Sequence, residues 1–220
     1  MANAYSLFAN GGKKVHPILI KRVENHEGEV IYEQKQEPEA ILRPDLAFVM
    51  THMLTGMFDK KLNGYASVTG STIINKMTQT YAGKSGSTNA DSWMIGYSPQ
   101  LVSAVWTGYD NGQTLELTSD KTYAKNIWIQ FMEEALAGTT AKSFKAPKDT
   151  VGVYINPENG KLATKDCPVK RFTYFTVGTE PTEYCTDHLF EEGQEPSHNG
   201  KKQPNEKQHV PWFKKVLPWS

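Results

Sequence analysis

The sequence has no long apolar run, no excess of charge of either sign and few cysteines. A membrane-spanning helix needs about 20 consecutive apolar residues, and none of the 220 residues lies in such a run. Lysine plus arginine number 24, as do aspartate plus glutamate, whereas nucleic-acid-binding domains are usually basic. The first residues lack the basic and apolar stretches of a signal peptide. A nucleic-acid partner, a membrane segment and a secretory leader are therefore not expected, and the chain as written would stay in the cytoplasm.

The two cysteines, Cys167 and Cys185, lie in one polar region. A structural zinc site requires four well-spaced ligands, and His188 is the one further ligand nearby, so we expect no metal. Two interpretations of the pair stay open. The cysteines are either unrelated free thiols or a disulfide that pins a region with little core in an oxidising compartment. We favour the disulfide, which would stabilise the fold by roughly 3 kcal/mol in the chain-entropy model.

Two segments have strong helical periodicity, at 45–58 and 120–138. The methionine-rich stripe of the first is expected to belong to the core. The second carries two adjacent apolar stripes, which together should cover a sheet. Asp120 is the expected cap and Gly138 the expected stop of this helix. Residues 1–12 predict the end of a further helix, which Gly11 and Gly12 terminate.

Short β-segments occupy most of the remaining chain. Residues 15–33 predict two strands around a turn at Gly28, and 60–77 predict a loop. Three strands at 77–88, 92–97 and 101–109, joined by Ser-Pro and similar turns, predict an antiparallel meander. We therefore expect an α+β fold with three parts: residues 1–146 as the main domain, 147–190 as a small β extension and 191–220 as a disordered tail.

The segment Lys84-Ser85-Gly86-Ser87-Thr88 concentrates binding chemistry at the end of a predicted strand. A lysine supplies a positive charge for a carboxylate, and the hydroxyls supply hydrogen bonds to it. Glycine lets a ligand approach the backbone closely, and a strand edge can pair with an extended peptide. Taken alone, a Lys-Ser-Gly match is a weak signal, because most such tripeptides are turns.

The flanking sequence makes the signal specific. The chain resembles the transpeptidase domain of class A penicillin-binding proteins in several separated stretches that occur in the order of that family. These are AYSLFANGG at 4–12, YAGKSGSTNADSWMIGYSP at 81–99, VWTGYD at 105–110, DCP at 166–168 and TEPTEYC at 179–185. The resemblance covers residues 2–190. It implies part of the fold shared by penicillin-binding transpeptidases and serine β-lactamases.

The resemblance implies a peptidoglycan D,D-transpeptidase that cross-links stem peptides through an acyl-serine. Its partners would be the D-Ala–D-Ala end of a stem peptide and β-lactams, with no cofactor. Lys84 would then attract the substrate carboxylate, the hydroxyls of Ser85 and Ser87 would hold it, and the backbone N–H of Ser87 would serve the oxyanion hole. Gly86 would keep the strand edge open, and Thr88 would orient the strand. Asp91 is expected to bond the adjoining turn.

The sequence departs from the family in one respect. Sites of this kind carry S-x-x-K, S-x-N and K-T-G, but no S-x-x-K occurs in the 220 residues. The S-x-N matches at 87–89 and 197–199 are chance, because that motif belongs before residue 1. We therefore expect a truncated transpeptidase that lacks its nucleophile and is inactive alone. Its parent would carry a glycosyltransferase domain and be anchored facing the cell wall.

Two other functions are alternatives to a truncated transpeptidase. A complete serine β-lactamase-like hydrolase would need the missing S-x-x-K and would not carry the cysteine-bearing extension. A non-catalytic module would use Lys84 and the strand edge to bind D-Ala–D-Ala peptides or penicillin without a covalent bond. For the truncated domain, we also expect one face of the 45–58 helix to be exposed, with low stability and aggregation as the result.

Overall fold

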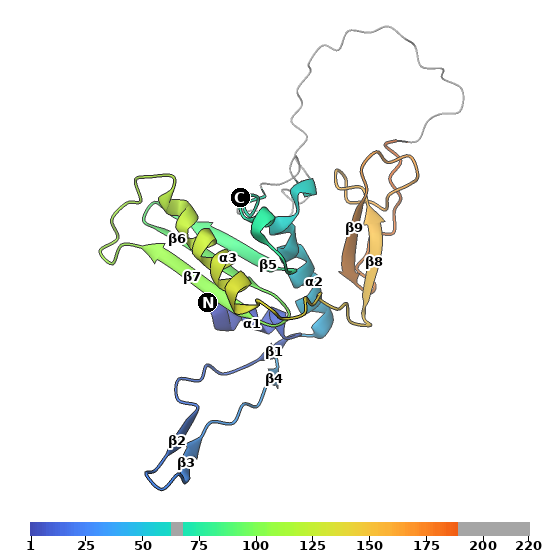
Figure 1. The fold of residues 1–220 in the computed structure, drawn as a ribbon. Coiled ribbons are helices and arrows are strands. Elements are labelled where there is room, and N and C mark those ends of the chain that lie inside the picture. Colours follow the sequence, from blue (N-terminus) through green and yellow to red (C-terminus); the bar gives the residue numbers. More distant parts are fainter. Residues whose placement is uncertain (63–67, 189–220) are drawn as a thin grey trace, which may run out of the picture. The chain divides into compact units, whose positions relative to one another are not determined.

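The computed structural model describes residues 1–62 and 68–188. The described residues divide into two compact units, one that begins at Met1 and one that begins at Thr150, which are described separately (Figure 1). The predicted disordered tail, with its aromatic end and the chance match at 197–199, lies outside the described residues. Among the described residues, no helix is long and apolar enough to cross a membrane.

A three-stranded antiparallel sheet forms the centre of the first unit. Its strands are β5 (Ala82–Ser87), β6 (Asp91–Tyr97) and β7 (Val102–Gly108), in the order β5-β6-β7. The predicted meander and the α+β class are thus confirmed. The first strand is shorter than predicted, because residues 77–81 lead into the sheet without pairing.

Helix α3 (Tyr123–Ala135) packs against β6 and β7 (Figure 1). Its fully buried Trp128 lies parallel to Phe58, with 6.0 Å between ring centroids, and meets Tyr81 edge-on at 5.2 Å. The sheet makes room for this indole with Gly96, where a Cβ atom would lie 2.4 Å from Trp128 Cζ2. Trp128 is therefore the centre of the core between α3 and the sheet.

Two predictions for this helix were wrong. Only the stripe that contains Trp128 is buried, whereas Tyr123, Ile127 and Phe131 are about half exposed. A single helix presents one side to a flat sheet, so the adjacent stripe faces outward. Asp120 does not cap α3. It lies in a preceding 3-10 turn, Asp120–Thr122, and its carboxylate accepts a hydrogen bond from Leu117 N at 3.2 Å. The predicted stop is confirmed by the left-handed backbone of Gly138, with φ of 74°.

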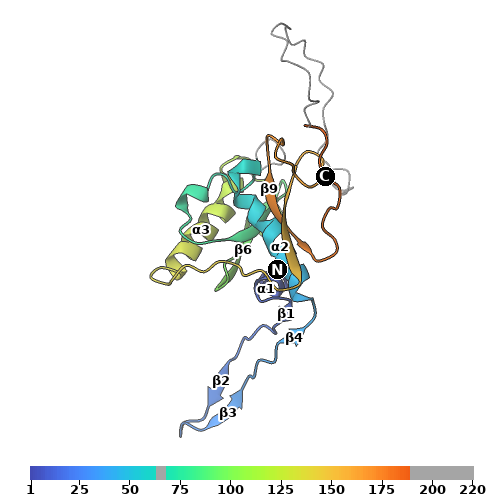
Figure 2. The same cartoon turned by 90° about the vertical axis from the view of Figure 1, so that its right-hand side faces the viewer.

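Helices α1 (Ala2–Ala9) and α2 (Pro44–Thr55) pack on the opposite face of the sheet (Figure 2). Tyr97 follows Gly96 in β6 and therefore points to this face, where its hydroxyl bonds Thr51 Oγ1 at 2.9 Å. A 3-10 turn, Gly56–Phe58, extends α2. As predicted, α1 ends at two glycines with positive φ, Gly11 and Gly12.

The interpretation of the methionine stripe of α2 as core was wrong for most of its length. Met53 is 64% exposed, and Leu46 and Met50 are also exposed. Ala47 and Thr51 are the buried positions, because the side of α2 that they form faces the rest of the unit. The prediction that one face of this helix is exposed is therefore confirmed, while low stability and aggregation stay predictions.

A long hairpin connects α1 to α2. Strands β1 (Lys13–Lys14) and β4 (Glu39–Ala40) pair at its base, and β2 (Arg22–Glu24) pairs with β3 (Val30–Glu33) near its tip. The predicted turn is confirmed, with Gly28 at φ of 85°. The first predicted strand is shorter than expected, because residues 15–21 form no regular pairing.

The second unit is built on one hairpin, β8 (Thr150–Ile155) with β9 (Arg171–Thr176). Isolated bridges join Leu162 to Ile155 and to Tyr184. Few side chains of this unit are buried: Ile155, Asn156, Pro157, Cys167 and Cys185.

Candidate functional site

The predicted binding segment lies on strand β5, at the edge of the sheet. In the described part of the chain, β5 pairs with β6 alone. Thr88 N donates to Asp91 O at 3.0 Å and closes the hairpin between the two strands. Hydrogen-bonded pairs alternate along an antiparallel ladder, so Gly86 and Lys84 also direct their backbone groups to β6. Consequently Ser85 and Ser87 direct their N–H and C=O groups to the outer edge.

Lys84 supports this assignment. Its ammonium donates to the carbonyl oxygen of Ser85 at 2.7 Å, which requires that carbonyl to point away from β6. The side chain is exposed. A positive charge thus lies beside the row of outward backbone groups, which is the arrangement that an extended peptide ending in a carboxylate would need.

The serine hydroxyls occupy the other face of the strand. Ser85 pairs in register with Met94, and Ser87 with Ser92, whereas Lys84 and Gly86 share a face with Ile95 and Trp93. The Ser85 hydroxyl donates to Thr69 Oγ1 at 3.0 Å. The structure therefore brings together Lys84 and the backbone of the two serines, but it does not place the serine side chains beside the lysine side chain.

Thr69 was not predicted as part of the site. It lies in the segment that was interpreted as a plain loop, and its backbone oxygen also accepts a hydrogen bond from Lys125 of α3 at 3.0 Å. No local pattern marks this residue, because its partners lie far away along the chain.

Thr88 and Asp91 stabilise the turn that ends the segment. The Thr88 hydroxyl donates to Asp91 Oδ1 at 2.7 Å and accepts the backbone N–H groups of Ala90 and Asp91, each at 3.1 Å. Trp106 Nε1 donates to Asp91 Oδ2 at 3.3 Å. Hydrogen bonds from Thr88 first, then Trp106, lower the pKa of the Asp91 carboxyl. The predicted structural role of Asp91 is thus confirmed.

A hollow of about 410 Å³ opens on the lysine face of the segment. It is lined by Met1, Tyr5, Lys84, Ser85, Gly86, Trp93 and Ile95. A Cβ atom on Gly86 would meet only Trp93 Cβ, at 3.8 Å, so packing within the chain does not require a glycine there. The glycine instead leaves Trp93 uncovered, and the hollow combines an apolar wall with one cation.

The cysteines lie in the second unit, away from this segment in sequence. Both are free thiols and both are buried. In the residues that the structure describes, no group of three or more histidine, cysteine or acidic side chains is placed to hold a metal ion. The disulfide stays a prediction.

Comparisons with known proteins agree with the sequence of the segment. The family model of the penicillin binding protein transpeptidase domain matches residues 1–133. The chain belongs to this family. A second family model, the C-terminal domain of penicillin-binding protein 1A, matches residues 146–190. The predicted resemblance to class A penicillin-binding proteins is therefore confirmed.

Individual relatives lead to the same family. The chain is 52% identical to penicillin-binding protein 2D of Bacillus subtilis over 185 residues, which cover 84% of this chain and 27% of that protein. It is 33% identical to penicillin-binding protein 1A of Aquifex aeolicus, covering 84% of this chain and 24% of that protein. The chain thus spans about a quarter of the length of these curated relatives.

A solved structure supports the fold. Penicillin-binding protein 1A from Haemophilus influenzae superimposes with a TM-score of 0.73 and 22% sequence identity, covering 84% of this chain and 32% of that one. Part of the fold of the penicillin-binding transpeptidases is thus present here, as the sequence predicted.

Proposed function

We propose that this chain supplies the substrate-binding strand of a peptidoglycan D,D-transpeptidase site. Strand β5 would hold the D-Ala–D-Ala end of a stem peptide, and β-lactams would occupy the same edge. The observation that carries the proposal is the alternation along β5, which turns Gly86 toward the sheet and the backbone of Ser85 and Ser87 outward.

Each group would then have a distinct task. The Lys84 ammonium, now on the Ser85 carbonyl, would turn to the terminal carboxylate, which is a stronger, charged acceptor. The N–H of Ser87 would donate to the oxygen of the scissile carbonyl as that oxygen gains negative charge. The outward carbonyl of Ser85 or Ser87 would accept an N–H of the peptide, as in strand addition.

The Ser85 hydroxyl could bind the substrate only after a rearrangement. To donate to the substrate carboxylate, the Ser85 hydroxyl would have to leave its bond to Thr69. That exchange is one hydrogen bond for another, so its net cost is small. Serine keeps the hydroxyl that threonine commonly provides at this position of the family motif.

Acyl transfer itself needs a nucleophile that this sequence does not provide. In the family reaction, a serine attacks the peptide carbonyl, D-alanine leaves, and an amine of a second stem peptide takes the acyl group. Without an S-x-x-K motif, the 220 residues bind the substrate but do not become acylated. The complete site would face the cell wall in an anchored parent.

The deciding experiment is intact mass spectrometry of the purified chain after incubation with a reporter penicillin. We expect no covalent adduct. Addition of one penicillin per chain would locate a nucleophilic serine here, and the assignment of roles would then be wrong. Peptide mapping of any adduct would identify that serine.

A non-covalent binding module is the second candidate, because Lys84 and apolar side chains of this chain line one hollow beside the strand. Calorimetric titration with a peptide ending in D-Ala–D-Ala tests it, with the C-terminal amide of the same peptide as a control. Measurable affinity for the acid alone, lost in Lys84→Ala, would favour the module. Equal affinity for acid and amide would exclude a carboxylate site at Lys84.

Proline substitution tests the direction of the backbone groups. A proline is tolerated at an edge strand where the N–H points outward, but it removes a ladder bond where the N–H points inward. We therefore expect Gly86→Pro to destabilise the unit by about 1–3 kcal/mol, because a ladder partner is left unsatisfied, and Ser87→Pro to cost clearly less. Urea unfolding of both variants measures this difference, and the opposite ranking would refute the outward N–H of Ser87.

A further inference from the structure

The second unit has few buried apolar side chains to stabilise it. A two-stranded hairpin is marginal in water on its own, and the described part of this unit adds no third strand to β8 and β9. Cys167 and Cys185 are among its few buried side chains, 4% and 1% exposed. Small units of this kind are usually held by a covalent or metal link. The two thiols are the groups in position to provide one.

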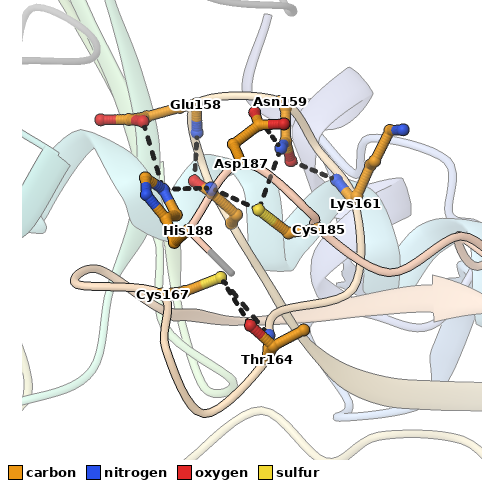
Figure 3. Close-up of polar contacts among 9 residues, drawn as sticks. Glu158, Asn159, Lys161, Thr164, Cys167, Cys185, Asp187 and His188 are labelled. Atoms are coloured by element: carbon orange, nitrogen blue, oxygen red, sulfur yellow. Dashed lines mark hydrogen bonds and ion pairs between the residues drawn. The ribbon is translucent and has the colours of Figure 1, made fainter. Parts of the chain in front are cut away.

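Two side-chain amides from the turn at 156–160 surround the Cys185 sulfur with hydrogen-bond donors. Its Sγ accepts hydrogen bonds from Asn156 Nδ2 and Asn159 Nδ2, each at 3.3 Å (Figure 3). The turn at 156–160 holds both amides in place: Asn156 Oδ1 accepts Glu158 N at 2.9 Å, and Asn159 Oδ1 accepts Lys161 N at 2.9 Å. Two amide donors on one sulfur favour the thiolate over the thiol.

The direction of the pKa shift of the Cys185 thiol agrees with this geometry. Burial is the largest influence on the Cys185 thiol and raises its pKa, but hydrogen bonds from Asn156, Asn159, the Asp187 backbone and Cys167 outweigh it, and the net effect lowers the pKa. Other titratable and charged groups lie around this site. His188 Nε2 is 3.3 Å from Asn156 Nδ2 and 3.9 Å from Glu158 Oε2, and Lys161 forms an ion pair with Glu183 at 2.9 Å.

Cys167 is the natural partner. It is one of the groups that lower the pKa of the Cys185 thiol, and its own Sγ accepts a hydrogen bond from Thr164 N at 3.4 Å. Figure 3 shows both cysteine side chains turned into the same interior space from separate segments. Those segments are already joined, because Leu162 N donates to Glu183 O at 2.9 Å and Cys185 N to Leu162 O at 2.8 Å.

We propose that Cys167 and Cys185 are a redox-active pair that closes a disulfide, with Cys185 as the attacking sulfur. The oxidant is a disulfide, such as oxidised glutathione. Because Cys185 is 1% exposed, this exchange takes place when the surrounding segment opens locally. The Cys185 thiolate then attacks one glutathione sulfur and releases glutathione thiolate. Cys167 then loses its proton and attacks the Cys185 sulfur, which releases the second glutathione. Two protein thiols are oxidised and one disulfide is reduced to two thiols, so atoms and electrons balance.

The test uses the whole chain, reduced, folded and then treated with oxidised glutathione. Mass spectrometry should show a monomer that has lost two hydrogen atoms and a peptide pair linked through Cys167 and Cys185. In the Cys167→Ser variant, glutathione should stay on Cys185. Thiols that stay free in the folded chain but link after denaturation would overturn the proposal, as would links mainly between chains.

A comparison of rates tests the order of attack. Glutathione should add to Cys185 in Cys167→Ser faster than to Cys167 in Cys185→Ser, because the gain in thiolate at Cys185 is only partly offset by its lower nucleophilicity. Faster addition to Cys167 would overturn the assigned roles. Circular dichroism shows whether each variant folds, and the wild-type mass result stands independently of both.

Asn159 is assigned as a positioning residue, so its variant needs a readout beyond stability. In the Cys167→Ser background, Asn159→Ala should slow glutathione addition to Cys185 in buffer but leave the rate unchanged in concentrated urea. Equal slowing in both would mean that the amide does not act through the folded site. The whole inference depends on the second unit alone, so it stands or fails separately from the proposed function.

Discussion

Different kinds of contact stabilise the interior of each of the two units. In the first, a buried tryptophan belongs to one cluster of aromatic and aliphatic side chains from 57 to 136, so residues far apart in sequence share one apolar core. In the second, few of the described side chains are buried, and the amides of Asn156 and Asn159 both donate to the buried Cys185 sulfur. The first unit therefore depends mainly on apolar packing, and the second relies more on side-chain hydrogen bonds.

The largest expected effect is the loss of Trp128. We expect Trp128→Ala to destabilise the first unit by about 3–5 kcal/mol, because a large buried side chain leaves a cavity. Phe131→Ala on the same helix is the control, since Phe131 is 48% exposed, and it should cost less than about 1 kcal/mol. Hydrogen exchange resolved by mass spectrometry measures each unit separately. Equal loss of protection in the second unit would show that the two units unfold together.

A pair of glycines sharpens the contrast within the first unit. Gly96→Ala would push a methyl group to 2.4 Å from Trp128 Cζ2, and overpacking of this kind costs about 1–3 kcal/mol. Gly86→Ala has open space, with its nearest neighbour at 3.8 Å, and should leave stability nearly unchanged. Thermal unfolding of both variants provides the measurement. A large loss in Gly86→Ala would mean that the glycine serves the fold rather than a ligand.

The second unit should respond to a polar deletion. Asn156 is 1% exposed, and its side chain bonds both Glu158 N and Cys185 Sγ. Asn156→Ala should cost about 1–2 kcal/mol, since buried partners would be left unsatisfied. Hydrogen exchange of β8 and β9 tests this. Thr173→Val is a control, because the Thr173 hydroxyl is buried without a partner among the described residues. A greater loss of protection in Thr173→Val than in Asn156→Ala would contradict the role given to the asparagine.

The smallest expected effect concerns Asp91. Its pKa is lowered in the folded chain, so the ionised carboxylate supports the hairpin above the unfolded pKa. That support is lost as the pH falls below about 4 and through the folded value. An NMR titration of the Trp106 indole N–H should report the change. In Thr88→Ala, the midpoint should move upward because the main donor to Asp91 is gone; an unchanged midpoint would contradict this account.

The local sequence was sufficient to predict the elements that carry the site. The turn residues between three short segments predicted the meander, and Lys84 to Ser87 of the predicted segment lie on its first strand. Burial was predicted less well. Helical spacing identified the apolar face of α2, but Met50 and Met53 are exposed, because periodicity shows which side of a helix is apolar and not what covers it.

Contacts between distant residues were beyond sequence reasoning. The bond from Ser85 to Thr69 and the two amides on Cys185 depend on how loops fold back. The direction of each backbone group on β5 also needed the register, which follows from the hairpin closure at Thr88. The candidate segment could thus be named from sequence, but the division of its residues between two faces could not.

The alternation along β5 has a consequence for how this strand can change over time. Lys84 and Gly86 use their backbone to hold the sheet, while Ser85 and Ser87 direct theirs outward. Under the proposed function, selection on folding and selection on ligand binding would therefore act on the backbone of alternate residues. Substitutions at 85 and 87 that keep a hydroxyl, such as serine for threonine, would then carry little penalty for the sheet, and such a strand could change its ligand preference while keeping its place in the fold.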